Sequence, residues 1–255
     1  MDLFLKDKVF IVTGGGAGIG GAITQTLIDE GAKVAAVARS AIHEDVAKRF
    51  GNHFIHVVTE LSDDEACAGA VAKSIKHFGR LDGLVNNAGV NDNVSLEHSV
   101  ADFRASLEKN LTHYFAMMHH ALPHLRASKG AVVNIGSKTA WTGQGQTSGY
   151  CAANGARAAL TREWAAALLD DGIRVNMVVP AEVMTPLYRR WIDSFENAQE
   201  KLDSIISKIP LEKRMTTPEE IAAMTVFLLS SRSAHTTGQQ IFVDGGYTHL
   251  DRSLT

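Results

Sequence analysis

The stretch TGGGAGIG (Thr13–Gly20) directly follows an apolar, β-branched run, Val9–Val12, and opens a helix-like segment. Glycines at such a junction let the backbone turn sharply and approach a pyrophosphate, whose charge is met by free N–H groups at the helix N-terminus. A glycine-rich string also suits ordinary tight turns, but its place between a first strand and a first helix is typical of a dinucleotide-binding fold. A P-loop nucleoside triphosphatase is disfavoured because no Gly-Lys-Ser/Thr ending follows.

The rest of the chain alternates strand-like and helix-like segments. The further strand-like runs are short, apolar and β-branched, as expected for strands covered on both faces: Val34–Val37, Phe54–Val58, Leu81–Val85, Ala131–Ile135, Arg174–Val179 and Gln240–Val243. The helix-like segments between them are Ile19–Glu30, Asp63–Phe78, Asp102–Leu125 and Gly149–Leu169. Because no change of composition breaks this order, the sequence predicts an α/β fold: a Rossmann-like, doubly wound parallel sheet in a single domain over residues 1–255.

Residues 184–208 interrupt the alternation between the last two strands and are rich in Tyr, Trp, Phe and charge. Such a segment could cover a polar ligand, so we expect a mobile substrate lid here. A helical insertion on the surface is an equally good interpretation of the same residues.

Bulk composition is that of an ordinary globular protein, with 45% hydrophobic and 21% charged residues. The net charge of −3 offers no broad basic field, so no nucleic acid partner is expected. The two cysteines, Cys67 and Cys151, and the scattered histidines show no metal-ligand spacing, so no metal is expected, and two isolated thiols fit a reducing cytoplasm. No apolar stretch approaches the roughly 18 residues that span a bilayer, so no membrane association is expected.

The residues after the second strand bear on the choice of cofactor. A dinucleotide fold places there the side chain that meets the adenosine ribose, and an acidic residue would favour NAD. This chain has Ala38-Arg39-Ser40 instead. A guanidinium at Arg39 can pair with a 2′-phosphate, which predicts that NADP is preferred and NAD is possible. The alternative is a solvated arginine in a strand-to-helix loop.

Further motifs complete a recognisable pattern. Besides Thr13-Gly14-x-x-x-Gly18-x-Gly20, they are Asn86-Asn87-Ala88-Gly89 after the fourth strand, Asn110 in a long helix, Ser137 after the fifth strand and Tyr150 opening the next helix. Over essentially the whole chain this pattern resembles the short-chain dehydrogenase/reductase family. The resemblance implies that Tyr150 exchanges a proton with the substrate oxygen, that Ser137 hydrogen-bonds that oxygen, and that Asn110 holds a relay water. A phenol and a hydroxyl can supply the proton transfer that accompanies hydride transfer.

The same resemblance implies which residues line the cofactor and how the protein assembles. The lining residues are Thr13, Gly14, Gly16, Gly18, Ile19 and Gly20 in the glycine-rich turn, Arg39, Glu60 and Leu61 after the second and third strands, Asn87, Ala88 and Gly89 after the fourth, and Pro180 and Val183 after the sixth. A homotetramer, built through the long helices and the C-terminal segment, is implied as well.

One position departs from the family pattern. The family has a lysine four residues after the tyrosine, where its ammonium favours the phenolate and binds the nicotinamide ribose, but this chain has Asn154. Because an ordinary phenol is only about one part in a thousand ionised at pH 7, turnover is expected to suffer unless another cation substitutes. Lys138 is the nearest candidate in sequence, although a solvent-facing lysine is the simpler interpretation.

Asn154 leaves three explanations open. They are an engineered substitution, a natural variant with another proton route, and a protein that binds cofactor without useful turnover. The sequence does not choose among them.

Positions expected to face the substrate are unusually polar. They are Asn91, Asp92, Lys138, Gln144 and Glu182. A steroid or fatty acyl group would leave such groups unpaired, at a cost of roughly 1–3 kcal/mol each if they are buried, whereas a polyhydroxylated ligand would pair them. The alternative is that several of these side chains point into water.

Four longer stretches are similar to the bacterial L-fucose dehydrogenases of the family: Ser148–Ala152, Leu160–Ala165, Pro180–Tyr188 and Asp244–Arg252. This similarity implies oxidation of the anomeric carbon of an aldose, L-fucose or a related sugar, to a lactone. Two other hypotheses remain: a cofactor-binding protein with weak or no catalysis, and a dehydrogenase of another polyol, keto-sugar or deoxy-sugar acid.

Overall fold

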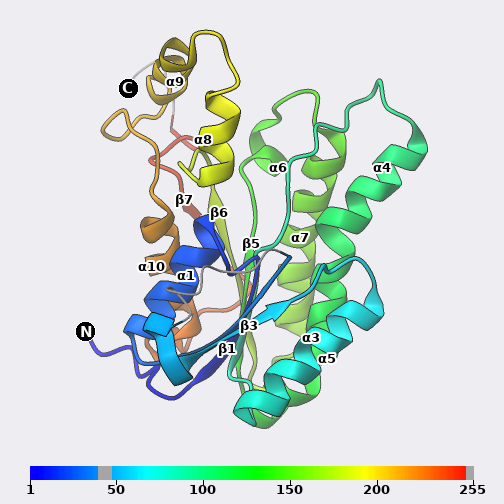
Figure 1. Ribbon diagram of the computed structural model, residues 1–255, viewed down its shortest axis with the longest axis vertical. Helices are drawn as coiled ribbons and strands as arrows, with labels where there is room; N and C mark the ends of the chain where they lie inside the picture. Colours follow the sequence, from blue (N-terminus) through cyan, green and yellow to red (C-terminus); the bar gives the residue numbers. More distant parts are fainter. Residues whose placement is uncertain (40–47, 251–255) are drawn as a thin grey trace.

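A seven-stranded parallel sheet forms the centre of the protein in the computed structural model, which describes residues 1–39 and 48–250 (Figure 1). The strand order is β3-β2-β1-β4-β5-β6-β7. The strands are β1 (Val9–Thr13), β2 (Lys33–Ala38), β3 (Phe54–Val58), β4 (Gly83–Asn86), β5 (Ala131–Ile135), β6 (Arg174–Pro180) and β7 (Gln240–Val243). The predicted doubly wound parallel sheet is therefore confirmed. Its winding reverses between β1 and β4, where open α/β sheets place their ligands.

The strand bounds follow the apolar runs closely because both faces of the sheet are covered. Three of the predicted runs, Phe54–Val58, Ala131–Ile135 and Gln240–Val243, coincide with strands, and the largest displacement is at β4. In the register of the central strands, Ile11 of β1 lies opposite Ala35 of β2 on one side and Leu84 of β4 on the other.

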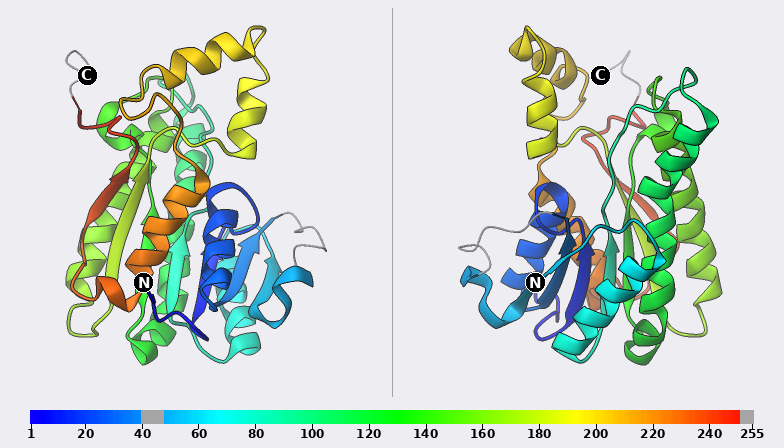
Figure 2. Two further views of the ribbon diagram at one scale, coloured as in Figure 1. Left: turned by 90° about the vertical axis from the view of Figure 1, so that its left-hand side faces the viewer. Right: turned by 45° about the vertical axis from the view of Figure 1, so that its right-hand side comes forward.

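Helices cover the sheet in two layers (Figures 1 and 2). On one face, α1 (Gly18–Asp29) packs against α10 (Pro218–Leu229). The other face carries α3 (Asp64–Phe78), α5 (His113–Ser128) and α7 (Ser148–Ala167). The shorter elements include α4 (Val100–Leu107), α6 (Thr139–Thr142), α8 (Pro186–Ile192), α9 (Ala198–Ile206), η1 (Gly51–His53) and η3 (Ser231–Ser233).

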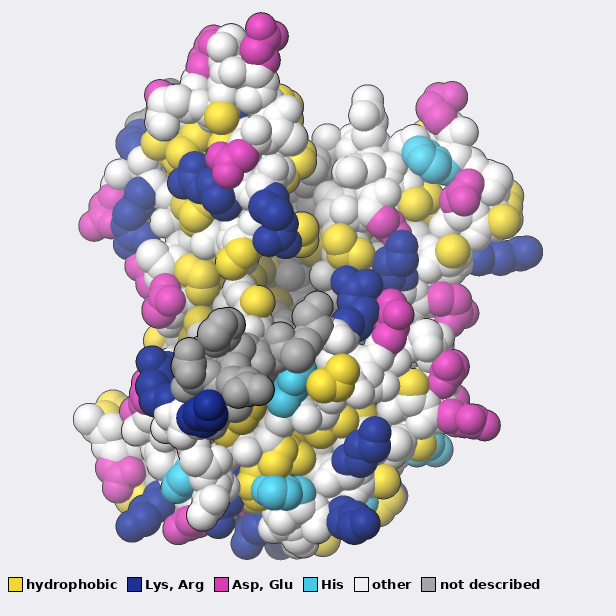
Figure 3. All heavy atoms as spheres, viewed as in Figure 1, with side chains coloured by type: hydrophobic (Ala, Val, Ile, Leu, Met, Phe, Trp, Pro, Cys, Tyr) yellow, Lys and Arg dark blue, Asp and Glu magenta, His cyan; other side chains and the backbone are white. Residues whose placement is uncertain are grey.

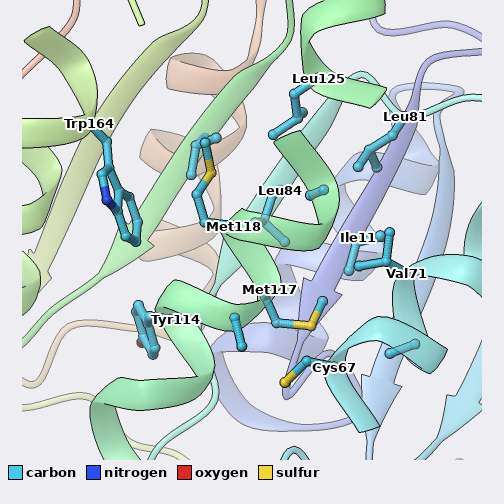
Figure 4. Packing of buried hydrophobic residues seen from close by; sticks show 14 of the residues in the cluster. Ile11, Cys67, Val71, Leu81, Leu84, Tyr114, Met117, Met118, Leu125 and Trp164 are labelled. Carbon is cyan, nitrogen blue, oxygen red and sulfur yellow. The ribbon is translucent and has the colours of Figure 1, made fainter. Parts of the chain in front are cut away.

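Two apolar layers hold these helices to the sheet. Under α3, α5 and α7, the side chains of Ile11, Leu84 and Met117 are fully buried, and Tyr114 lies among them (Figure 4). Each large apolar side chain removed from water contributes about 1.5–3 kcal/mol to folding. The long, fully apolar strands of the sequence are thus explained by burial from both sides.

Local capping sets the bounds of several helices. Asp63 caps α3 by accepting a hydrogen bond of 2.8 Å from the N–H of Ala66, and Gly79 ends the helix with a left-handed φ of 78°. Thr217 and Glu220 form a capping box at the start of α10. Such caps satisfy backbone groups that the helix ladder leaves free.

The segment predicted as one helix, Asp102–Leu125, differs from that prediction. A π-helical turn, η2 (Glu108–Thr112), separates α4 from α5. Asn110 sits inside this turn, where its side-chain amide donates to the carbonyl of Ser106 at 3.1 Å. Apolar periodicity cannot reveal such a turn, because one extra residue in a helix keeps the flanking segments helical.

The insertion between β6 and β7 is helical and projects beyond the carboxyl end of the sheet (Figure 1). Its two helices are α8 and α9, and a row of ring contacts runs from Tyr188 through Trp191 to Phe195, with centroid distances of 5.2 and 5.0 Å. Residues 184–208 therefore form a helical insertion next to the predicted ligand site, and their role as a lid stays a prediction.

Candidate active site

The glycine-rich turn lies between β1 and α1 at the carboxyl end of the sheet (Figure 1). Gly14 has a φ of 66°, and a Cβ there would stand 2.8 Å from the side-chain nitrogen of Asn87. A Cβ at Gly20 would overlap the carbonyl oxygen of Gly14. Glycine is thus required at both positions by close contact, and at Gly14 also by its backbone conformation.

Hydrogen bonds tie this turn to the end of β4. The hydroxyl of Thr13 accepts from the N–H groups of Asn87 at 2.8 Å and Ala88 at 3.1 Å, and the Asn87 amide donates to the Thr13 carbonyl at 2.9 Å. At the start of α1, Ala17 offers no side-chain cap to the first N–H groups. Free N–H groups above a glycine cradle suit a pyrophosphate, so these residues fit a dinucleotide cofactor.

The predicted adenosine end shows an exposed ion pair. The guanidinium of Arg39 lies 3.3 Å from the carboxylate of Glu60, with 73% and 64% of the two side chains exposed. Exposed pairs of this kind contribute little, so a 2′-phosphate could compete for the guanidinium. Leu61 is half-buried against the core, and Ser40 of the predicted stretch lies outside the described residues.

Ser137 and Tyr150 occupy the same corner at the carboxyl end of β5. Ser137 follows β5, and its hydroxyl accepts from the N–H of Thr139 at 3.3 Å. Tyr150 lies in the first turn of α7, where the next residue, Cys151, donates its thiol to the Thr139 carbonyl at 3.1 Å. The loop that carries Ser137 thus contacts, through Thr139, the residue next to Tyr150, and we call this place the Ser137–Tyr150 corner.

Asn110 is fully buried and holds the turn after β4. Its side-chain oxygen accepts from the N–H of Val90 at 2.8 Å. A Cβ at Gly89 would lie 3.1 Å from that oxygen and 2.9 Å from a guanidinium nitrogen of Arg157. Both polar atoms of the Asn110 side chain therefore have partners within the protein.

Asn154 is also fully buried and links two residues of α7. Its amide nitrogen donates to the carbonyl of Tyr150 at 2.9 Å, and its oxygen accepts from Nη1 of Arg157 at 3.1 Å. Sequence reasoning missed Arg157. The available signal was its spacing, three residues after Asn154 and seven after Tyr150, which puts a charged side chain on the inner face of the helix.

Arg157 perturbs its titratable neighbours on α5. Burial and, to a smaller extent, the charge of Arg157 lower the pKa of His113 to about 4. Burial raises the pKa of Tyr114, the charge of Arg157 opposes that rise and Tyr150 adds to it, and the resulting pKa is about 12. At neutral pH the site therefore holds a neutral imidazole, a neutral Tyr114 phenol and a buried cation.

Lys138 does not face solvent, so the simpler interpretation of this residue is wrong. It is 7% exposed and forms an ion pair with Glu182, whose other oxygen accepts from the hydroxyl of Tyr188 at 2.7 Å. The ammonium also lies 3.8 Å from the ring centroid of Tyr247. Burial and the Glu182 carboxylate raise the pKa of Tyr188 well above its usual range. This cluster joins the loop after β5 to α8.

The other predicted substrate residues are placed differently. Asn91 accepts a hydrogen bond from the Thr147 hydroxyl at the start of α7, and Asp92 accepts from Ser106 at 2.9 Å. Gln144 is exposed in the loop between α6 and α7. Because Asn91, Asp92 and the Lys138–Glu182 pair already have protein partners, an apolar ligand would not leave them unpaired, and that part of the sequence argument is corrected.

The start of the 184–208 insertion lies against the cofactor turn. A Cβ at Gly18 would be 3.4 Å from the side chain of Thr185, which caps α8. Pro180 ends β6 and accepts from the N–H of Lys138 at 3.0 Å, and Val183 is buried. The surface is hollowed between the α8–α9 region and the α4–α6 region (Figure 3).

Clusters of metal-binding side chains and membrane-spanning helices do not occur in the part of the chain that the structure describes. Within residues 1–39 and 48–250, no three His, Cys, Asp or Glu side chains gather in a way that could hold a metal ion. No helix in these ranges is long and apolar enough to cross a bilayer.

Similar proteins are dehydrogenases and reductases. Residues 14–248 match the family described as enoyl-(acyl carrier protein) reductase. The chain is 35% identical over 241 residues to the L-fucose dehydrogenase of Bos taurus, which covers 94% of this chain and 88% of that protein. It is 36% identical to 2-(S)-hydroxypropyl-CoM dehydrogenase 3 of Xanthobacter autotrophicus, covering 96% and 98% of the two chains.

Among solved structures, the Cj0485 dehydrogenase is 44% identical, with a TM-score of 0.97 and coverage of 100% of this chain and 99% of that one. The L-fucose dehydrogenases found are mammalian, whereas the sequence resemblance pointed to bacterial ones. Together with the glycine cradle and the Ser137–Tyr150 corner, these matches show that the chain belongs to the short-chain dehydrogenase/reductase family.

Proposed function

We propose that this oxidoreductase is an NADP-preferring aldose 1-dehydrogenase acting on L-fucose or a stereochemically related sugar. The observation that supports the proposal is the contact between the loop that carries Ser137 and the turn that carries Tyr150, at the carboxyl end of the sheet. The sugar assignment is supported by the similarity to proteins named L-fucose dehydrogenase. The similarity to a hydroxypropyl-CoM dehydrogenase keeps a different alcohol as the second candidate.

The residues of the corner would divide the proton chemistry between them. The oxidised nicotinamide cofactor, when bound, accepts the hydride that leaves the anomeric carbon. Tyr150 takes the proton of the anomeric hydroxyl, and Ser137 orients that oxygen by a hydrogen bond. The C1–H and O–H bonds break, and the C=O bond of the lactone forms. Asn110 holds the turn that carries Gly89. The hydrogen bonds between Thr13 and Asn87 hold the glycine-rich turn against the end of β4.

Cofactor choice in this proposal rests on Arg39. Its guanidinium would bind the 2′-phosphate of NADP, in exchange for the weak contact with Glu60. With NAD, the ion pair would simply persist. The remaining cofactor-lining residues of the proposal are Gly14, Gly16, Gly18, Ile19, Gly20, Leu61, Ala88, Pro180 and Val183.

Residues 184–208 would close over the sugar in this proposal. The contact between Glu182 and Tyr188 attaches α8 to the pocket, and the Lys138 ammonium holds the same carboxylate from the opposite side. Charged hydrogen bonds to sugar hydroxyls are strong, so this pair could bind a hydroxyl without losing its internal contact. Asn91, Asp92 and Gln144 would stand at the rim.

Reduction of NADP and NAD by a panel of aldoses, polyols and hydroxy acids tests the proposal. Purified protein should reduce NADP with L-fucose or a related aldose, and both Tyr150→Phe and Ser137→Ala should abolish the rate while NADP still binds, as measured by quenching of tryptophan fluorescence. Rapid oxidation of a non-sugar alcohol with no aldose activity would favour the second candidate. Cofactor binding without any turnover would favour a non-catalytic protein.

A cytoplasmic homotetramer completes the proposal. Exposed apolar side chains on the long helices support assembly: Phe115 on α5 is 56% exposed, and Leu169 just after α7 is 62% exposed. Covering them in an oligomer would remove apolar surface from water. Light scattering coupled to gel filtration should give four times the chain mass, and Phe115→Glu should lower it.

A further inference from the structure

Arg157 is a buried cation with an unusual set of partners. Only 2% of the residue is exposed, and its hydrogen bonds go to uncharged oxygen atoms. Within residues 1–39 and 48–250, no carboxylate lies within ion-pair distance of its guanidinium. Burying an ion costs several kcal/mol unless it is compensated, so buried arginines are usually paired with carboxylates. This arginine therefore needs a functional explanation.

The guanidinium joins three elements at the back of the active site. Nε donates to the carbonyl of Asn110 at 2.9 Å, and Nη2 donates to the same oxygen. Nη1 donates to the carbonyl of Ile135, the last residue of β5, at 3.3 Å. The guanidinium carbon lies 4.1 Å from the ring centroid of Tyr114. The π turn explains why this carbonyl can receive two N–H groups, because a widened turn displaces carbonyls from the α-helical ladder.

On α7, Arg157 reaches Tyr150 through one intermediate. Nη1 donates to the side-chain oxygen of Asn154 at 3.1 Å, and the Asn154 nitrogen donates to the carbonyl of Tyr150 at 2.9 Å. These three residues share the inner face of the helix. Asn154 therefore has its orientation fixed from one side by the guanidinium and in turn braces the turn that carries Tyr150.

We propose that Arg157 is the cation of this active site, a positioning residue that performs through Asn154 and Asn110 the task that a lysine at position 154 has in the family pattern. The inference rests on the proposed hydride-transfer function of Ser137 and Tyr150. Compared with the family pattern, the positive charge of this site lies at position 157, about one helical turn further along α7, and position 154 has an amide instead of an ammonium.

The charges around Arg157 favour this role. From α5, His113 and Tyr114 face it, and both are neutral at pH 7.

The charged groups of the other neighbouring elements are paired or exposed. From η2, the Lys109 ammonium pairs with Asp92, at 3.5 Å. From α4, Asp102 and Arg104 are exposed. From the loop after β5, Lys138 is paired with Glu182. Among the described residues, these neighbours leave the charge of Arg157 without a carboxylate to balance it.

A simple return of lysine is consequently expected to harm the protein. The oxygen of Asn154 is 3.1 Å from Nη1 of Arg157, so an ammonium at position 154 would meet a like charge in a buried place. One cation fits, at 154 or at 157, but not at both. This exclusion tests whether Arg157 carries the charge of the site, and the kinetics of its variants test whether that charge serves catalysis.

Kinetics of Arg157 variants form the first test. With the best aldose found for the wild type, Arg157→Leu should lower kcat at pH 7 by about 10²-fold with a much smaller change in KM, and the loss should shrink as the pH rises toward 10. Arg157→Lys should recover a large part of the rate. A matched control is Arg174→Leu, which also removes an arginine that donates to backbone carbonyls but lies at the start of β6.

Arg174→Leu should lower Tm and leave the pH profile of kcat unchanged. A folded Arg157→Leu protein with the rate and pH profile of the wild type would overturn the inference while leaving the proposed function intact.

Thermal melting forms the second test and needs no activity. In the wild-type background, Asn154→Lys should lower Tm by several degrees more than Asn154→Met, which has a similar shape without the charge. In the Arg157→Leu background that difference should disappear or change sign. Equal Tm values for the two Asn154 variants beside Arg157 would contradict the inference.

The kinetic and melting experiments distinguish a failure of the proposed function from a failure of the inference about Arg157. If Arg157→Leu fails to fold, Arg157→Gln supplies the uncharged background for both tests. If none of the alcohols in the panel supports reduction of NADP by the wild type, the proposed function fails. The melting experiment then remains as the test of whether Arg157 supplies the charge that the family lysine supplies.

Discussion

His113 should make the stability of this protein depend on pH between about 7 and 4. Its ring is 4% exposed, Nε2 lies 3.1 Å from the carbonyl of Lys109, and Nδ1 is buried without a hydrogen-bond partner among the described residues. Burial and the nearby Arg157 charge hold its pKa at about 4, against 6.5 in an unfolded chain. The folded protein therefore keeps the imidazole neutral over a range in which the unfolded chain takes up a proton.

The sign and size follow from this difference. Above pH 6.5 both states are neutral and the contribution is constant, whereas below 6.5 the unfolded chain binds more protons and stability falls until the folded ring also titrates near 4. Each pKa unit corresponds to 1.36 kcal/mol, so acidification from pH 7 to 4.5 should cost about 2 kcal/mol through this residue alone.

Urea unfolding of the wild type and His113→Gln, followed by circular dichroism at one protein concentration, measures the effect. Glutamine can still donate to the Lys109 carbonyl but does not titrate, so the variant should lose about 2 kcal/mol less than the wild type between pH 7 and 4.5. His119→Gln, exposed on the same helix, is the control and should follow the wild type. Parallel pH curves for wild type and His113→Gln would refute the reasoning.

Three further outcomes are expected. Gly20→Ala should weaken NADP binding by at least about 10²-fold in a fluorescence titration because its Cβ would overlap the carbonyl of Gly14, whereas Gly21→Ala, with ordinary contacts, should bind normally. Arg39→Ala should raise the Kd of NADP by roughly 10-fold and leave that of NAD nearly unchanged; equal losses would contradict the phosphate-binding role. Glu182→Gln should raise KM for the aldose several-fold with unchanged NADP affinity, and an unchanged KM would remove this carboxylate from the sugar site.

The fold was predictable because its signals are local and repeated. Fully apolar strands such as Ala131–Ile135 stand out when both faces of a sheet are covered, and the glycine-rich turn marks the first crossover. The break in the helix at Glu108–Thr112 could not be predicted, since its cause is a set of contacts among Asn110, Val90 and Arg157 from three separate segments.

The candidate site was predictable only in its motif residues. Ser137 and Tyr150 have a characteristic spacing, so their corner was expected. Lys138 and Glu182 are 44 residues apart, and no sequence pattern predicts that they form an ion pair. Arg157 carried a weak signal in its spacing from Tyr150, but a single arginine on a helix is more often solvated than buried.

The contact between Gly18 and Thr185 has a consequence for the order of events in a catalytic cycle. A Cβ at Gly18 would lie 3.4 Å from Thr185, the N-cap residue of α8, so a pyrophosphate bound at the first turn of α1 would lie beside the start of α8. We therefore predict ordered binding, in which the dinucleotide arrives first, completes the surface beside α8, and departs last. Product-inhibition patterns should then be competitive between the two forms of the dinucleotide and noncompetitive between lactone and dinucleotide.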